Sequence, residues 1–181
     1  MTMEDAEERR RLNHLFAEID TGFREGDAAR LAAALGGSPR WFDEPMPHEL
    51  GLGHPLEYAI YWSPVSFIEA LISLGSSPNY VDDAGFPSLL ATLSTTRVDR
   101  LAILELLLAH GADPNQRGIN DWTPLHWAAG HGDGDAVKLL LKHGADPGQR
   151  TRIDYYETPE EEAWRAGFGA VADLLRRHGK P

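Results

Sequence analysis

The sequence predicts an all-α fold made of repeated pairs of short helices. The clearest copy of this pattern runs from Asp121 to Pro147. Thr123-Pro124 suits a helix start, because threonine supplies a capping oxygen and proline at the first helical position has no N–H to lose. After a glycine-rich turn, apolar residues recur at helical spacing: Ala136, Val137, Leu139, Leu140 and Leu141. Gly144 then suits the left-handed end of this second helix. Altered copies of the pattern lie on both sides of it.

This unit resembles an ankyrin repeat. The matching residues are Thr123–His126, Ala128, Ala129, Gly132, Leu139–Leu141 and His143–Pro147. The resemblance implies an ankyrin-repeat solenoid of about five stacked helix-turn-helix units, joined by short finger or β-turn connections. In such a fold a single repeat cannot bury its own apolar stripe, so neighbouring repeats supply the core.

The N-terminal part of the chain departs from the pattern. Residues 4–36 are expected to form two helices without the opening Thr-Pro, which is typical of a terminal repeat. We expect residues 1–52 to be an N-terminal capping repeat and a long connecting arm, and residues 53–181 to be four ankyrin-type repeats in a single continuous domain. Trp41 and Phe42 of the arm either pack back on the cap or help to bind a partner.

One repeat is longer than the others. From the opening alanine to the closing glycine, the copies at 59–75, 128–144 and 163–179 each span 16 positions, whereas the copy at 91–111 spans 20. Four additional residues are therefore expected within Ser94–Leu101, where the two helices connect. An insertion there predicts a longer loop that leaves the stacked core intact.

Composition narrows the classes of partner. The formal net charge of -11 argues against nucleic acid and anionic membranes. It favours a basic partner protein, unless the acidity serves only to keep the chain in solution. The chain has no cysteine, no apolar N-terminal signal and no apolar run long enough to span a bilayer. We therefore expect a cytoplasmic monomer.

The resemblance also implies where a partner would bind. In ankyrin proteins the first helices and the finger tips line a groove. Here the groove positions and the finger position before Thr-Pro hold mostly aromatic or apolar residues: Tyr58, Tyr61, Trp62, Leu90, Trp122 and Trp127. Acidic finger residues are expected to rim this row: Asp82, Asp83, Asp121 and Asp154. Aromatic rows are typical of binding hot spots, although several of these side chains could instead pack under the fingers as core.

Catalytic and metal-binding patterns are not found. The resemblance implies that His126 and His143 hydrogen-bond to backbone between repeats, and no His-Glu-x-x-His pattern or phosphate-binding glycine loop is present. We expect no cofactor and no metal. The sequence therefore predicts a non-catalytic protein-binding module. An inhibitor of a toxin or enzyme, as an immunity protein or antitoxin is, stays open as an alternative, and a small-ligand sensor or an enzyme is less favoured.

Overall fold

In the computed structural model, residues 3–81, 84–153 and 155–179 are described. They form ten α-helices, and none of them lies in a β-strand. The chain divides into two compact units, Met1–Ser77 and Pro78–Pro181. The predicted all-α class is confirmed, and the helices follow one another as five pairs.

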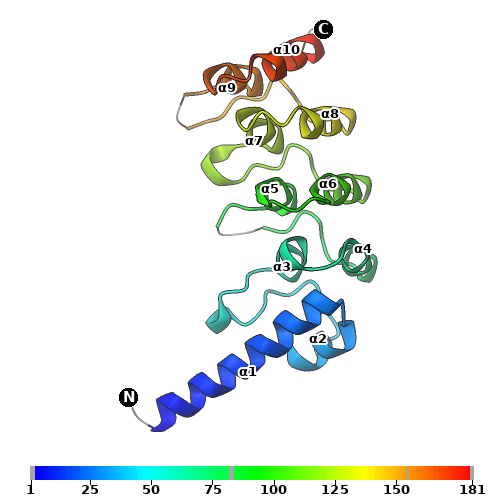
Figure 1. The fold of residues 1–181 in the computed structure, drawn as a ribbon, viewed down its shortest axis with the longest axis vertical. Helices are drawn as coiled ribbons and strands as arrows, with labels where there is room; N and C mark the ends of the chain where they lie inside the picture. Colours follow the sequence, from blue (N-terminus) through cyan, green and yellow to red (C-terminus); the bar gives the residue numbers. More distant parts are fainter. Residues whose placement is uncertain (1–2, 82–83, 154, 180–181) are drawn as a thin grey trace. The chain divides into compact units, whose positions relative to one another are not determined.

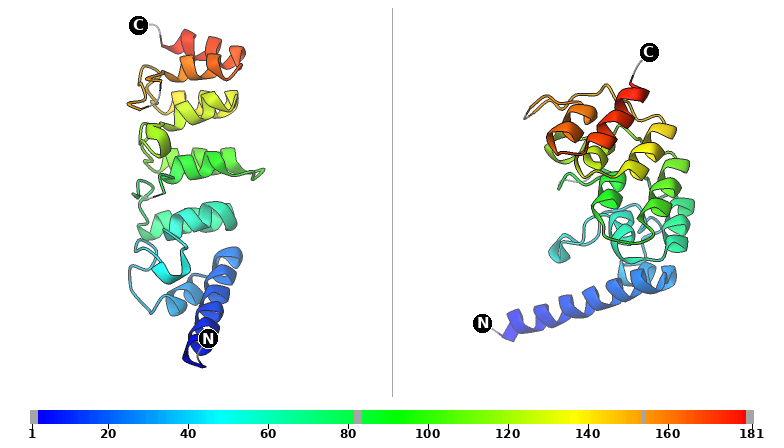
Figure 2. Two further views of the ribbon diagram at one scale, coloured as in Figure 1. Left: turned by 90° about the vertical axis from the view of Figure 1, so that its left-hand side faces the viewer. Right: turned by 45° about the horizontal axis from the view of Figure 1, so that its top comes forward.

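The first unit contains four α-helices and one 3-10 helix among its described residues. They are α1 (Met3–Glu25), α2 (Ala28–Ala34), η1 (His48–Leu50), α3 (Pro55–Trp62) and α4 (Val65–Leu74). Helix α1 extends well past α2 (Figure 2). Its apolar stripe is buried only in the second half, where Ile19 and Phe23 are fully covered, whereas Phe16 is 42% exposed.

The connecting arm of the first unit folds back onto the protein. Trp41 and Met46 are buried, and the Asp43 carboxylate accepts a hydrogen bond from the backbone N–H of Ser77 at 3.1 Å. The Phe42 ring lies against Gly75 at the end of α4, where an added Cβ would come within 3.4 Å of it. Of the two interpretations of this segment, packing is therefore confirmed, although Phe42 packs on α4.

The second unit contains three helix pairs. They are α5 (Ser88–Ser94) with α6 (Arg100–Ala109), α7 (Pro124–Gly130) with α8 (Gly134–Lys142), and α9 (Pro159–Arg165) with α10 (Gly169–His178); η2 (Ile119–Asp121) precedes α7. Figure 1 shows α5, α7 and α9 following one another on one side and α6, α8 and α10 on the other. The apolar stripes face each other between pairs, and Leu104, Leu107, Leu125, Val137 and Leu140 are fully buried.

The predicted helix starts are confirmed at Thr123 and Thr158. Each threonine hydroxyl accepts a hydrogen bond from the backbone N–H three residues later, and a proline follows it at the first helical position. At Thr158 the Glu161 carboxylate binds the threonine N–H in return at 2.8 Å. This reciprocal pair satisfies two N–H groups that a helix start otherwise leaves without partners, and it lowers the pKa of Glu161.

The insertion is only partly a loop. The connection between α5 and α6 is Thr95–Asp99, five residues, whereas the next pair is joined by the three residues His131–Asp133. Two of the four additional residues therefore lengthen the connection. The other two extend the end of α5 and the start of α6 by one position each. Ser94, Arg100 and Leu101 are thus helical, which corrects the expectation that all of Ser94–Leu101 forms the connection.

Truncating Leu140 tests the core of the second unit. Leu140 is fully buried, so Leu140→Ala should lower the free energy of unfolding by about 2–5 kcal/mol through lost burial and a cavity. Denaturant titration followed by circular dichroism measures this. Lys138→Ala, on the exposed side of the same helix, should change it by less than about 0.5 kcal/mol. Equal losses in the two variants would show that this stripe is not the core.

Candidate partner-binding surface

Four rings gather at the first helices of the second unit. The Trp127 ring on α7 lies 5.9 Å from Phe86 and 5.9 Å from Trp122, each in an edge-to-face arrangement, and it stacks on His131 at 4.7 Å. We call Phe86, Trp122, Trp127 and His131 the aromatic cluster. The structure thus brings together Trp122 and Trp127, which the sequence predicted, and adds Phe86 and His131, which were not among the predicted contact residues.

The cluster is held by backbone contacts as well as by ring packing. The His131 Nδ1–H donates to the backbone carbonyl of Trp127 at 2.8 Å. A carbonyl oxygen can only accept, so the proton lies on Nδ1 and the Nε2 end of the ring is left for other contacts. Trp122 and Trp127 are half-buried and His131 is exposed, so the cluster is anchored on one side and presents ring surface on the other.

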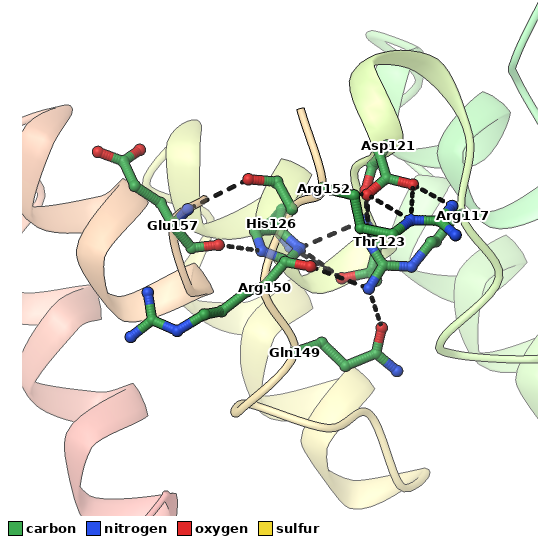
Figure 3. A network of polar contacts seen from close by, with 9 residues as sticks. Arg117, Asp121, Thr123, His126, Gln149, Arg150, Arg152 and Glu157 are labelled. Carbon is green, nitrogen blue, oxygen red and sulfur yellow. Dashed lines mark hydrogen bonds and ion pairs between the residues drawn. The ribbon is translucent and has the colours of Figure 1, made fainter. Parts of the chain in front are cut away.

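A buried histidine ties this repeat to the next one (Figure 3). The His126 Nε2–H donates to the backbone carbonyl of Glu157 at 3.0 Å, and Nδ1 lies 2.8 Å from the Thr123 hydroxyl, which donates to it. The ring is therefore the neutral tautomer, and burial lowers the pKa of His126. The expected backbone hydrogen bond of His126 is confirmed. His143 differs, because its Nε2 lies 3.4 Å from the Glu105 carboxylate instead.

Asp121 lies inside an ion-pair network rather than on a rim (Figure 3). Its carboxylate is 2.6 Å from the Arg117 guanidinium and 2.5 Å from that of Arg152. It also accepts the backbone N–H of Arg152 at 2.6 Å, and only 9% of the side chain is exposed. The hydrogen bond from Arg152 holds the pKa of Asp121 below its usual range. The expectation that Asp121 rims the groove is wrong, because two arginines neutralise it.

Two of the predicted contact residues are core residues. Tyr58 is buried in the first unit, where its hydroxyl donates to Asp20 at 2.7 Å and burial raises its pKa. Leu90 is fully buried in the second unit. The finger residue Gly118 passes so close that an added Cβ would lie 2.4 Å from Leu90 Cδ1. The alternative of packing under the fingers therefore holds for Leu90, and the expected exposure is wrong for both residues.

Two further predicted contact residues, Tyr61 and Trp62, lie in the first unit. Trp62 in the first unit is 49% exposed, and the Arg24 guanidinium lies over its ring at 4.6 Å. Tyr61 beside it is half-buried. The acidic residues Asp82, Asp83 and Asp154 lie outside the described residues.

The finger between α8 and α9 carries exposed side chains that the sequence reasoning missed. Ile153, Tyr155 and Tyr156 are 48%, 72% and 62% exposed. The backbone N–H of Thr151 donates to the carbonyl of Glu157 at 3.0 Å and closes this short loop. The Arg165 guanidinium lies 5.1 Å from the Tyr155 ring centre. The signal available in the sequence was the adjacent tyrosine pair in a connecting finger, since exposed loop aromatics commonly make contacts.

A comparison with protein families fits this geometry. A family model described as ankyrin repeats (3 copies) matches residues 56–151 and 91–180. The chain belongs to the ankyrin repeat family. Its aromatic cluster and its exposed finger both fall within the matched ankyrin region. Ankyrin repeats generally mediate contacts between proteins and are typically non-catalytic.

A relative of this ankyrin protein is found in a plant. Protein VAPYRIN-LIKE of Medicago truncatula is 44% identical over 48 residues. The match covers 26% of this chain and 10% of that protein. This chain therefore covers about a tenth of the length of that relative, and the likeness is confined to those 48 residues.

The ankyrin surface shows no metal centre in the part of the chain that the structure describes, where no group of three histidine or acidic side chains is placed to hold an ion. Among the same residues, no helix combines the length and the apolar character needed to cross a membrane.

The buried His126 predicts a pH dependence of stability. Its pKa in the folded protein lies below the unfolded value of about 6.5, so unfolding takes up a proton at acidic pH. Its contribution to stability should be fully present above about pH 6.5 and be lost as the pH falls toward the folded-state pKa. Urea titrations give the free energy of unfolding of the wild type and of His126→Gln. The difference between the two free energies should therefore shrink on acidification.

Comparing the wild type with His126→Gln removes the effect of other titrating groups on stability. His54, whose pKa burial also lowers, titrates in both proteins and cancels in the difference. A difference that stays constant between about pH 7.5 and 5 would show that His126 is not held in its neutral form.

Proposed function

We propose that this ankyrin chain binds a partner protein through the surface formed by the aromatic cluster and the exposed finger of the second unit. The observation that carries the proposal is the cluster itself. Trp127 is packed edge-on by Phe86 and Trp122 and stacked by His131, yet part of each indole and the His131 ring reach the surface.

The energetics of such a surface favour binding. Tryptophan and tyrosine bury a large area with few rotatable bonds, so they lose little conformational entropy on binding. The rings of the cluster already restrain one another, which lowers that loss further. Binding energy at protein interfaces concentrates in a few tryptophan, tyrosine and arginine residues. Tyr155 and Tyr156 supply exposed rings on the next finger.

The charge of this surface narrows the partner. Asp121 is neutralised by Arg117 and Arg152, and Glu157 is paired with Arg165 at 2.8 Å. The described acidic groups beside the cluster therefore carry arginine partners. The proposal therefore rests on contacts of the aromatic rings rather than on attraction to a basic protein. These residues give no support to the alternative that the chain inhibits a basic toxin.

The test measures affinity after a partner has been captured from cells that produce this protein. Trp127→Ala should weaken binding by at least about 2 kcal/mol, as expected for a central aromatic contact. His131→Ala and Tyr155→Ala should weaken it too, and because both side chains are exposed they should leave melting unchanged. Lys138→Ala, on the exposed side of α8, is the matched control and should bind like the wild type.

Two results would contradict the proposal. One is wild-type affinity in both His131→Ala and Tyr155→Ala. The other is loss of binding in Lys138→Ala or Lys142→Ala, which would place the contact on α8.

A further inference from the structure

A pocket of about 370 Å³ lies beside the aromatic cluster in the second unit. One wall is the five-residue connection after α5, with Thr95 and Thr96. The other wall is Trp127 and His131, and the rest of the lining comes from Leu93, Ser94, Arg100, Ala128 and Asp133. The corresponding connections in the next two pairs have three residues each. The additional residues of this repeat thus supply part of the pocket lining.

Arg100 and Asp133 are the charged side chains that line the pocket. Arg100 pairs with Asp133 through one guanidinium nitrogen. The other Asp133 oxygen accepts the backbone N–H of Ala136 at 3.1 Å, which caps α8. Both oxygens of that carboxylate are therefore engaged. The Arg100 guanidinium makes no other hydrogen bond to the described residues and keeps further N–H groups for a ligand. Its side chain is 30% exposed.

The remaining lining fits the rest of an acidic side chain. Leu93 and the Trp127 ring supply apolar surface for methylene groups. The Nδ1–H of His131 is already used by the Trp127 carbonyl, so Nε2 is the free end of that ring. The charges of Arg100 and Asp133 cancel, so the pocket is not acidic although the chain carries a net charge of -11. A cationic ligand would meet the free N–H groups of Arg100.

We propose that this pocket binds a glutamate side chain of the partner, with Arg100 holding the carboxylate and Leu93 and Trp127 contacting the methylene groups. Guanidinium groups bind carboxylates through two parallel N–H donors. This inference rests on the proposed function, because it names a group that the same surface recognises.

The first test uses small probes and needs no partner. N-acetylglutamate amide is titrated into the whole protein and followed by NMR at the Trp127 indole N–H and the Thr95 and Thr96 amides. Saturable shifts are expected in the millimolar range, with N-acetylglutamine amide at least about tenfold weaker because it lacks the charge. Arg100→Gln should abolish the shifts. Arg97→Gln, in the same connection and paired with Asp99 at 2.7 Å, should keep them.

A second variant guards against a folding defect in Arg100→Gln. Deleting Thr95 and Thr96 shortens the connection to the length found in the next pair, which the fold should tolerate, and should also remove the response. Equal binding of the glutamine probe, or undiminished shifts in Arg100→Gln, would overturn the proposal.

The captured partner separates this proposal from the proposed function. Arg100→Gln should weaken its binding at least about tenfold, and Arg97→Gln should not. If His131→Ala and Tyr155→Ala lose the partner while Arg100→Gln binds like the wild type, the surface stands and the pocket proposal fails. If none of the three weakens binding, both fail.

Discussion

Hydrogen bonds from one repeat to the backbone of the next are the interaction on which the second unit depends. The buried His126 donates to the Glu157 carbonyl. Two asparagines make the same kind of link in other loops. The Asn79 side chain donates to the Gly111 carbonyl at 2.8 Å and accepts the Asp113 N–H at 2.7 Å. The Asn115 side chain does the same one repeat later, with the Gly144 carbonyl at 3.3 Å and the Asp146 N–H at 2.8 Å. A loop without regular structure otherwise leaves its backbone groups to water, so these side chains fix the spacing between neighbouring helix pairs.

The same links determine what the surface displays. Because Glu157 is bound by His126 and Arg152 is bound by Asp121, the finger between α8 and α9 is attached at two points. Its exposed Ile153, Tyr155 and Tyr156 lie between these attachments or directly beside them. An acidic residue that looks available to a partner in the sequence is thus a structural anchor. Asp121 therefore affects binding only indirectly, because it fixes the position of the finger that carries Tyr155 and Tyr156.

Local patterns were enough to predict the elements of the fold. Thr123 and Thr158 are capping residues, and a capping motif is contained within four consecutive residues. The burial of Leu140 follows from helical spacing in the same way. The aromatic pair Trp122 and Trp127 was also predicted, because the ankyrin resemblance assigns one position to the groove and the other to the finger that precedes the helix.

The rest depended on contacts that a local pattern does not contain. Leu90 has a groove position in the repeat, but Gly118 covers it. Tyr58 became a core residue because Asp20, 38 positions away, accepts its hydroxyl. Asp121 is neutralised in part by Arg152, 31 positions away. The insertion was located correctly, but its division between loop and helix is decided by where α5 ends and α6 begins.

Hydrogen–deuterium exchange of the free protein and of its complex tests the central claim most directly. Partner binding should slow exchange in residues 119–131, which carry Trp122, Trp127 and His131 of the aromatic cluster, and in residues 151–157 of the exposed finger, and it should leave the exposed side of α8 unchanged. Slower exchange confined to α6, α8 and α10, with no change in those two stretches, would contradict it.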